Sequence, residues 1–265
     1  MFEFGKALDV GIRRKGKKNQ DNLCIIKALT GHPLVVVADG MGGYRGGAEA
    51  SQIVINVFRA AYRKHKAAAP MADVLREAAI AAYQEIVARS RSQEEFNKMG
   101  STVVAAAIHG STGKVTVVNV GDSRAYLINK HSIQVISHDH SEVAELQRKG
   151  VLSAREAQDY ARKNVLTMSL TASRSENLIE PFLAAVDFPK GSILLLCSDG
   201  LWGSVPESLI HATALEYSPR KAAKQLVKLA NASGGPDNIS VIIVRRKGEW
   251  KQYKKKHSID REDTF

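Results

Sequence analysis

The sequence contains little that would place it in a membrane or in a disulfide-stabilised fold. Two cysteines in 265 residues, Cys24 and Cys197, are too few for a disulfide framework, and both lie in apolar stretches that suit small buried side chains. The longest aliphatic runs, residues 34–38 and 193–197, are far shorter than the roughly 20 apolar residues of a membrane-spanning helix. The first eleven residues contain two acids and no apolar run typical of a signal peptide. We therefore expect a cytoplasmic protein without a membrane span.

The charge balance is strongly basic, although the composition is otherwise that of an ordinary globular protein. Hydrophobic residues make up 44% and charged residues 25%, which argues against disorder or a coiled coil. Lys and Arg total 38 against 27 Asp and Glu, giving a net charge of +11. The excess is concentrated in residues 13–18 and 245–256, and such clusters attract phosphates, acidic peptides, nucleic acid or anionic lipid. We expect one domain over residues 1–246 and a charged tail over 247–265, which either contacts nucleic acid or an anionic surface or is simply solvated.

The order of the expected elements is typical of an α+β domain. Strand-like runs are expected at residues 7–12, 23–29, 34–39, 102–109, 114–120, 124–129, 182–186, 192–197 and 239–244. Helices are expected at 47–66, after Pro70, at 205–217 and at 219–232, and a polar helical segment broken by Gly150 is expected over 141–162. Short glycine-containing turns join the runs between 102 and 129, which favours an antiparallel meander. Many strands with paired helices predict sheets covered by helices.

Acidic side chains stand where the expected buried strands meet glycine-containing turns. Asp39 and Asp199 each end an aliphatic run and are followed by glycine, Asp122 follows Gly121, and Asp237 stands just before the last expected strand. Asp-Gly is a favoured turn pair, so one such residue alone would indicate only a turn. Four of them at the strand ends of one packed core are expected to share a cleft.

Clustered carboxylates predict a hard divalent cation, because without one they repel each other and lose hydration. Mg²⁺ and Mn²⁺ prefer oxygen ligands, and no His-x-x-x-His or Cys-x-x-Cys spacing offers a zinc site. The Gly40 carbonyl is a further candidate ligand, since glycine lets the backbone approach an ion. Two ions about 3.5–4 Å apart can activate a water for attack on a phosphoester. An arginine nearby can hold the phosphate oxygens.

Eight short motifs along the chain occur in the order of a known family. They are Asn19–Asn22, Asp39–Gly43, Gly100–Thr102, Val120–Tyr126, Asp139–Ser141, Asn164–Thr167, Ser198–Trp202 and Asp237–Ser240. Together they resemble the 2C-type, metal-dependent Ser/Thr protein phosphatases (PPM family) in their compact bacterial branch. The resemblance extends from about Asp9 to Val244, and its specificity comes from the number and order of the motifs rather than from any one of them.

The resemblance implies an αββα sandwich, in which helix pairs flank two central antiparallel sheets and the metals lie in a cleft at one end. It implies hydrolysis of phosphoserine and phosphothreonine monoesters by direct attack of a metal-bridging water, without a phosphoenzyme. It also implies two Mn²⁺ or Mg²⁺ ions, with a third ion left open. Phosphorylated proteins would be the substrates, and a cognate Ser/Thr protein kinase would be the opposing enzyme.

Carried over by motif, the resemblance also implies roles for single residues. Asp39 would bridge two ions and Gly40 would offer its carbonyl to one, while Asp199 and Asp237 would bind the other. Asp122 with Asp199 resembles a third metal site. The full expected set consists of catalytic Arg14, Asp39, Asp199 and Asp237; metal-binding Asp21, Asp39, Gly40, Asp122, Asp199 and Asp237; phosphate-binding Arg14 or Arg13; and auxiliary Gln20 and Asn238.

Three features depart from the family pattern: Gln20, the length of segment 11–21, and residues 168–171, which read Met-Ser-Leu-Thr where Arg-Ala-Leu-Gly is commoner. Gln20 stands where an acid is usual, which is expected to weaken a water-mediated contact to one ion. The segment 11–21 is about two residues longer than usual, so Arg13 and Arg14 are alternatives for the phosphate clamp. Met41 is typical of the bacterial branch and stands where animal members have histidine, so the leaving group would be protonated by water or by another group.

Other protein classes fit parts of the sequence. Residues 11–18 nearly match a phosphate-binding P-loop, but Lys18 replaces the hydroxyl that binds Mg²⁺, and no helix is expected to follow. A cysteine-dependent phosphatase needs an arginine six positions after the thiolate, where Thr30 and Gly203 stand. A metal-dependent nuclease would suit the acids and the positive charge. A phosphatase-like module that only binds would suit Gln20, whereas the four retained acids favour the enzyme.

Overall fold

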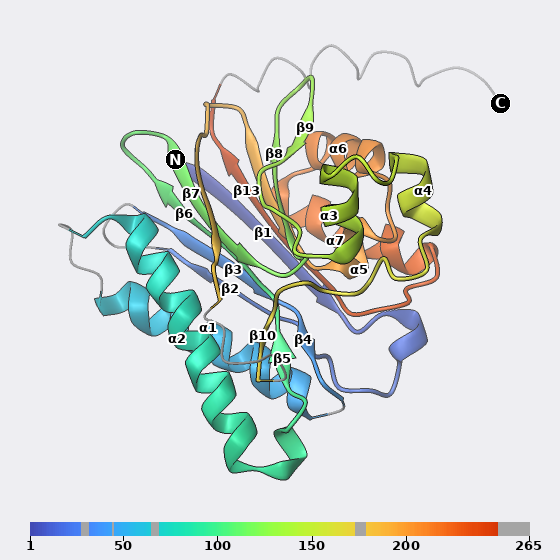
Figure 1. Ribbon diagram of the computed structural model, residues 1–265. Coiled ribbons are helices and arrows are strands. Elements are labelled where there is room, and N and C mark those ends of the chain that lie inside the picture. The colour runs from blue at the N-terminus through green and yellow to red at the C-terminus, as the bar shows by residue number, and fades with distance from the viewer. Residues whose placement is uncertain (28–31, 44, 65–68, 173–178, 249–265) are drawn as a thin grey trace.

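Two five-stranded antiparallel sheets form the centre of the structure (Figure 1). The computed structural model describes residues 1–27, 32–43, 45–64, 69–172 and 179–248. The first sheet has the strand order β1 (Phe2–Asp9), β13 (Ile239–Arg246), β12 (Ile193–Cys197), β8 (Arg124–Ile128) and β9 (Ile133–Val135). The second has the order β11 (Phe182–Asp187), β7 (Lys114–Val120), β6 (Val103–His109), β3 (Leu34–Ala38) and β2 (Asn22–Ile26). A small third sheet consists of β10 (Leu170–Thr171), β5 (Gly100–Ser101) and β4 (Gly40–Met41).

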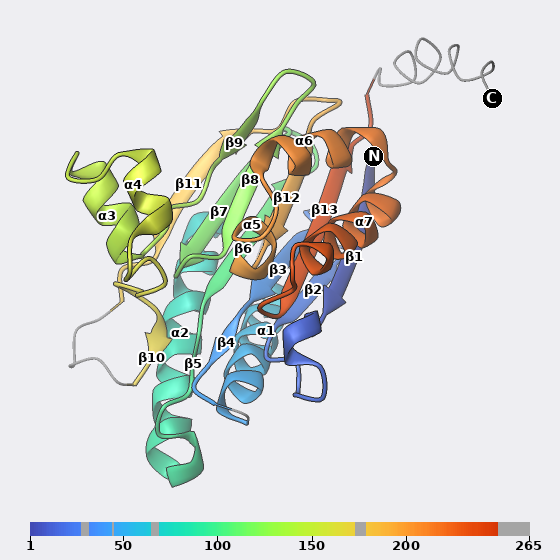
Figure 2. The ribbon, with the colours of Figure 1, turned by 90° about the vertical axis from the view of Figure 1, so that its right-hand side faces the viewer.

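Helix pairs cover the outer faces of the two large sheets (Figure 2). The helices α1 (Gly46–Lys64) and α2 (Met71–Ser92) pack on the second sheet, and α6 (Glu207–Glu216) and α7 (Pro219–Ala232) pack on the first. The shorter helical elements are η1 (Ile12–Arg14), η2 (Glu94–Phe96), α3 (Glu142–Arg148), α4 (Ala154–Asp159) and α5 (Asp199–Trp202). This arrangement confirms the expected α+β class and αββα sandwich.

Three layers of apolar side chains hold the two large sheets and the two helix pairs together. Along β12, Leu194 and Leu196 point between the two sheets, whereas Ile193 and Leu195 point toward the α6–α7 layer. Strand β3 alternates in the same way between the inter-sheet layer and the α1–α2 layer. Because successive strand residues face opposite sides, a strand covered on both faces must be apolar throughout. The uninterrupted aliphatic runs of the sequence are explained by this double burial.

The start of the chain differs from the sequence-based prediction. Strand β1 spans Phe2–Asp9 instead of 7–12, and a short 3-10 turn follows it at Ile12–Arg14. It pairs along its whole length with β13, so its hydrogen-bonding partner rather than its own periodicity sets its length. Gly5 permits a close approach to α7, because a Cβ there would lie 2.0 Å from the Pro219 carbonyl oxygen. The short strands β4, β5, β9 and β10 were also missed, since two or three residues carry no recognisable period.

Other sequence-based expectations have clear outcomes. The polar segment 141–162 forms α3 and α4, with Gly150 between them at φ 72°. No helix follows residues 11–18 before β2, so the P-loop alternative is wrong. None of the helices in the described ranges is long and apolar enough to span a bilayer. The expected tail, 247–265, lies outside the described residues except for its first two positions.

Leu195 tests how much the layer between the first sheet and its helices stabilises the fold. Its side chain is 0% exposed, and truncating such a leucine to alanine costs about 2–5 kcal/mol through lost burial and the cavity left behind. We expect Leu195→Ala to lower the free energy of unfolding by that amount in urea denaturation. Leu209→Ala on α6 is the matched control, because Leu209 is 41% exposed and its loss should cost less than about 1 kcal/mol. Equal losses in the two variants would contradict the layered packing.

Candidate active site

Several strand ends meet at the edge of the sandwich beside the small sheet (Figure 2). Strands β3 and β7 run in the same direction and are followed by Asp39 and Asp122, while antiparallel pairing of β12 with β13 brings Asp199 and Asp237 to one edge. A cavity of about 1000 Å³ opens there. Its lining consists of Arg13, Arg14, Lys17, Lys18, Gln20, Asp39, Gly40, Met41, Gly42, Gly43, Lys98, Thr102, Asp122, Asn164, Leu166, Ser169, Thr171, Asp199, Pro236 and Asp237. The structure thus brings together the four acids that end or precede these strands.

The backbone of Asp39 is held from the neighbouring small sheet. Thr102 N donates to the Asp39 carbonyl at 2.8 Å, and the Ser101 hydroxyl donates to the same oxygen at 3.0 Å. Asp39 N donates in turn to the Thr102 hydroxyl at 3.2 Å. The next residue must be glycine, because a Cβ at Gly40 would lie 1.9 Å from the Gly47 carbonyl oxygen. The Asp39–Gly40 segment after β3 therefore packs against the N-terminus of α1, with no room for a larger residue at position 40.

Asp21 lies behind these acids and is outside the cavity lining. Its side chain is 2% exposed, and its Oδ2 accepts from the hydroxyls of Ser198 and Ser240, each at 2.7 Å. Asp21 Oδ1 and Asp199 Oδ1 are buried, and no donor of the described chain reaches either atom. The Asp39 carboxyl is a close neighbour of both residues, because its interactions contribute to the pKa shift of each. The three carboxyls thus form one group, in which Asp21 is buried and Asp39 and Asp199 are partly buried where they line the cavity.

Burial and mutual repulsion make these acids hard to ionise. Burial raises the pKa of Asp21 to about 7, the Asp199 charge adds to the rise, and the two serine hydroxyls oppose it. Burial also raises the pKa of Asp39 well above its usual value, and the charges of Asp21 and Asp199 increase that shift. For Asp122, burial followed by the charges of Asp199 and Asp139 raises the pKa to about 8. The pKa of Asp199 rises for the same reason, with Asp237 as its strongest charged neighbour.

This donor set has the chemistry that suits Mg²⁺ or Mn²⁺. All the candidate ligands are oxygens, two of them are buried without a donor, and a divalent cation would offset the repulsion that raises the pKa values. Among the residues that the structure describes, no three or more His, Cys, Asp or Glu side chains form a ready-made cage. This is compatible with ions that keep several water ligands and take only one or two carboxylates each.

Arg14 is the arginine that is built into the acidic end of the cavity. Its Nη2 lies 2.9 Å from Asp237 Oδ2, and its Nη1 donates to Gln20 Oε1 at 3.2 Å. The side chains of Arg14 and Asp237 are 33% and 34% exposed, so the pair lies at the mouth of the site rather than at its bottom. Arg13 also lines the cavity, but it is exposed, and its guanidinium makes no ion pair with any acid in the described ranges. This geometry favours Arg14 of the two candidates.

Gln20 and Asn238 connect the arginine to the backbone around it. Gln20 N donates to Asn238 Oδ1 at 2.8 Å, and Asn238 Nδ2 donates to the Val10 carbonyl at 2.8 Å. The Gln20 side chain also donates from Nε2 to the Gly43 carbonyl. Its amide therefore bridges Arg14 and the glycine loop after β4, which requires both a donor and an acceptor. An acid at this position could accept from Arg14 but could not donate to Gly43 while ionised.

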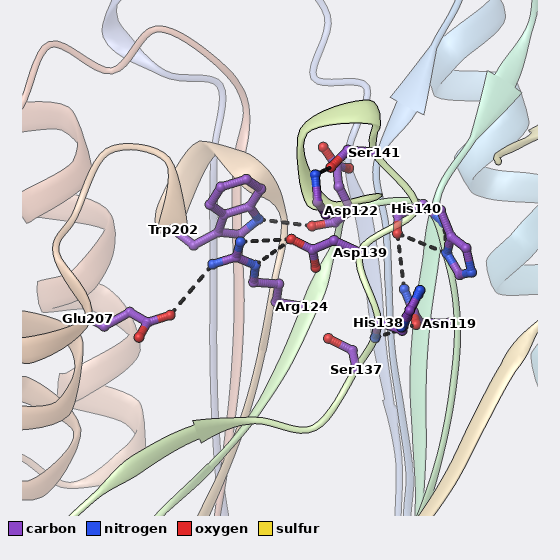
Figure 3. A network of polar contacts seen from close by, with 12 residues as sticks. Asn119, Asp122, Arg124, Ser137, His138, Asp139, His140, Ser141, Trp202 and Glu207 are labelled. Carbon is purple, nitrogen blue, oxygen red and sulfur yellow. Dashed lines mark hydrogen bonds and ion pairs between the residues drawn. The ribbon is translucent and has the colours of Figure 1, made fainter. Parts of the chain in front are cut away.

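A cation-centred network supports the Asp122 loop from behind (Figure 3). Arg124 donates from Nε and Nη2 to Asp139 Oδ2 at 2.9 and 2.7 Å, and its guanidinium lies 3.7 Å from the centre of the Trp202 ring. Trp202 Nε1 donates to the Asp122 carbonyl at 2.9 Å. Because Trp202 ends the short helix that begins at Asp199, this contact links the two segments that carry cavity acids. The sequence motifs contained Arg124, Asp139 and Trp202 but gave them no role.

Sequence reasoning also missed part of the cavity lining. Lys17 and Lys18 stood out only as members of a basic cluster, and Ser169 and Thr171 only as part of a segment that departs from the family pattern, while nothing in the sequence marked Lys98. Lys98 reaches the cavity because the segment after η2 packs on the glycine loop, where a Cβ at position 42 would lie 2.0 Å from the Lys98 carbonyl oxygen. Contacts between distant loops produce no local period or motif. They become visible only in the folded chain.

Residues 11–233 match the family described as protein phosphatase 2C. The chain belongs to this family. It is 36% identical over 232 residues to the serine/threonine phosphatase Stp of Listeria monocytogenes, covering 86% of this chain and 90% of that protein. Its fold superposes on the serine/threonine phosphatase of S. agalactiae with a TM-score of 0.85 and 29% identity, over 93% of this chain and 100% of that one. It also resembles the catalytic domain of the phosphatase PstP in complex with two manganese ions, with a TM-score of 0.80 and 27% identity over 93% and 99% of the two chains.

The buried acids of this phosphatase-family chain predict its response to pH without metal. An acid whose pKa is raised by folding stabilises the fold while it is protonated, so its contribution is complete below about pH 4 and is lost as the pH rises through about 7 and 8. In chelator, we expect the melting temperature to fall by about 5 °C or more between pH 5 and pH 8. Circular dichroism melts across this range measure it.

Two variants make the pH experiment specific. Asp122→Asn removes one of the buried charges, so its melting temperature should fall less steeply with pH than that of the unchanged protein. Asp187→Asn is the control, because Asp187 is exposed at the end of β11 and should leave the slope unaltered. Identical slopes in all three proteins would show that the buried acids do not govern the response.

Proposed function

We propose that this chain is a Mn²⁺- or Mg²⁺-dependent phosphatase that hydrolyses phosphoserine and phosphothreonine in proteins. Membership of the protein phosphatase 2C family supports the reaction class. Relatives named serine/threonine phosphatase, and a similar structure in complex with two manganese ions, support the substrate and the metal. The observation that carries the proposal is the set of desolvated, mutually repelling carboxyls at one end of the sandwich.

The metal-holding residues in this proposal are the acids and one backbone carbonyl. Asp39 and the Gly40 carbonyl would hold the first ion, with Asp39 shared by the second, which Asp199 and Asp237 would also bind. Asp122 with Asp199 is the proposed location of a third ion, and Asp21 supports the group from behind. When bound, such ions supply charge compensation and lower the pKa of a water near the phosphate.

The remaining residues would bind and orient the phosphate. Arg14 uses two of its five N–H donors on Gln20 and Asp237, so further donors remain for phosphate oxygens. Gln20 fixes the guanidinium plane, and Asn238 fixes Gln20, so both act as positioning residues. The part of the cavity wall that the structure describes contains no histidine, and Met41 is part of it. Protonation of the leaving serine or threonine oxygen is therefore assigned to water in the open cavity.

The proposal extends to the surroundings of the enzyme. We assign residues 1–246 to the catalytic domain, because β13, the last strand of the first sheet, ends at Arg246. Residues 247–265 would then form a separate basic segment, with nucleic acid or an anionic surface as its alternative contacts. An opposing Ser/Thr protein kinase is proposed from the reaction class, and a cytoplasmic location from the two free, buried cysteines.

Metal removal and Asp39→Ala test the reaction. We expect Mn²⁺-dependent release of phosphate from a phosphothreonine peptide, its loss in chelator, and a fall in kcat of about 10²–10³-fold or more in Asp39→Ala. Asp187→Ala should keep full activity, because that residue is exposed and far from the cavity lining. Undiminished turnover in Asp39→Ala would refute the site. A well-folded protein that binds Mn²⁺ but never releases phosphate would instead indicate a binding module, and cleavage of plasmid would indicate a nuclease.

Arg14 and Arg13 form a matched pair for testing the phosphate clamp. Arg14→Ala removes charge-assisted hydrogen bonds worth about 1.5–3 kcal/mol each, so kcat/KM for the phosphopeptide should fall about 100-fold. Arg13→Ala should lower it by no more than about threefold, because an exposed charge contributes little. Steady-state kinetics on both variants decides between them. The reverse order of effects would move the clamp to Arg13.

A further inference from the structure

Cations outnumber acids along the cavity, and most of them have no part in the chemistry proposed above. The lining contains five basic side chains, Arg13, Arg14, Lys17, Lys18 and Lys98, against the four acids Asp39, Asp122, Asp199 and Asp237. Within the described residues, the three lysines form no ion pair with any acid. All three are exposed, whereas Asp122 is buried and Asp39 and Asp199 are partly buried. The rim formed by Lys17, Lys18 and Lys98, the lysine rim, is thus positive around an acidic interior.

The first part of the lysine rim stands on an anchored loop. Arg13 N donates to the Gly235 carbonyl at 3.0 Å, and Ile12 N donates to Asn231 Oδ1 at 3.1 Å. Lys17 N donates back to the Arg14 carbonyl at 3.0 Å and closes a turn. Lys17 and Lys18 therefore lie within a few residues of Arg14, the proposed phosphate clamp. This loop is the dark blue segment that follows β1 in Figure 2. It belongs to the segment 11–21, which was expected from the sequence to be longer than the family pattern.

Lys98 completes the rim from another part of the chain. It follows η2, and its backbone packs on the glycine loop after β4, so its position is set by the same loop that Gln20 contacts. A phosphate bound at Arg14 would lie in a mouth with unpaired positive charge contributed by two separate segments. Exposed lysines with long flexible stems suit side chains that flank the phosphorylated residue rather than the phosphate itself.

We propose that the lysine rim makes this enzyme prefer phosphorylated sites flanked by acidic residues. The proposal deepens the proposed phosphatase function and rests on it. Carboxylates beside the phosphorylated residue would pair with Lys17, Lys18 and Lys98, while the phosphate enters the acidic interior beside Arg14. Basic flanking residues would meet like charge at the same rim. The recognised chemistry is therefore an acidic peptide segment around phosphoserine or phosphothreonine.

The experiment compares two phosphothreonine peptides that differ only in their flanks. One carries Asp and Glu on both sides of the phosphothreonine, and the other carries Asn and Gln in their places. With Mn²⁺, we expect the ratio of kcat/KM, acidic over neutral, to be about three- to tenfold, the sum of a few exposed ion pairs. The ratio should approach one in Lys17→Ala/Lys18→Ala and fall below one in Lys17→Glu/Lys18→Glu.

Lys15→Ala is the matched control, because Lys15 lies on the same loop, is exposed and does not line the cavity. It should keep the ratio of the unchanged protein. A ratio near one in the unchanged protein, a ratio retained in both double variants, or an equal loss in Lys15→Ala would overturn the proposal. In the first two cases, the lysines would be a solvated surface only; in the third, the preference would come from the general positive charge of the loop rather than from the lysine rim.

A second readout separates this proposal from the phosphatase proposal. Hydrolysis of p-nitrophenyl phosphate by the unchanged protein reports on the reaction without any flanking residue. Fluorescence anisotropy measures binding of the two labelled peptides to Asp39→Asn protein, with and without Lys17→Ala/Lys18→Ala. Absence of hydrolysis together with tighter binding of the acidic peptide would refute the phosphatase proposal and support recognition of acidic flanks by the lysine rim. Hydrolysis without any difference between the acidic and neutral peptides in dissociation constant or kcat/KM would support the phosphatase proposal and refute the flank preference.

Discussion

The site depends on one electrostatic constraint, which is that several carboxyls are held close together where little water reaches them. Antiparallel pairing sends the end of β12 and the start of β13 to the same edge, and the second sheet adds the ends of β3 and β7. The apolar layers hold these strands in register, so the acids cannot separate to relieve their repulsion. Packing of the core therefore works against the electrostatics of the site. Protonation or a divalent cation is what reconciles them.

The two sheets are also joined at this edge by polar contacts. Asp21 precedes β2 of the second sheet. Its Oδ2 accepts from Ser198, which follows β12 of the first sheet, and from Ser240, which lies in β13 of the same sheet. Asn238 adds a second link by bonding both Gln20 and Val10. Within the layer between the sheets the contacts are made mainly by apolar side chains, which fix distance but little orientation. Directional hydrogen bonds at the site end set the angle between the acids of the two sheets, and they are shielded from water by the burial of Asp21.

Much of this fold could be predicted from the sequence, because the strands that matter are apolar on both faces. The aliphatic runs 34–38 and 193–197 indicated strands buried on both faces of a sheet. The acid that follows each run, Asp39 or Asp199, indicated the edge of the sheet where the site lies. Arg13 and Arg14 could not be separated in the same way, since they are adjacent and chemically identical. Only the Asp237 ion pair and the Gln20 amide distinguish them. The expectation that Gln20 weakens a water-mediated contact to one ion stays a prediction, and the structure adds that its amide has two partners that one carboxylate could not serve together.

Charge at this site changes with depth, and depth decides which interactions salt can screen. Asp21 is 2% exposed and Arg14 with Asp237 about one third exposed, while the lysine rim is open to solvent. Mobile ions screen exposed charges over about 8 Å at physiological ionic strength but reach buried pairs poorly. Interactions made by the rim are therefore sensitive to ionic strength, and those made by the interior acids are not. The proposed selection of substrates by their flanks is thus expected to weaken as ionic strength rises, whereas the contacts among the buried acids are expected to persist.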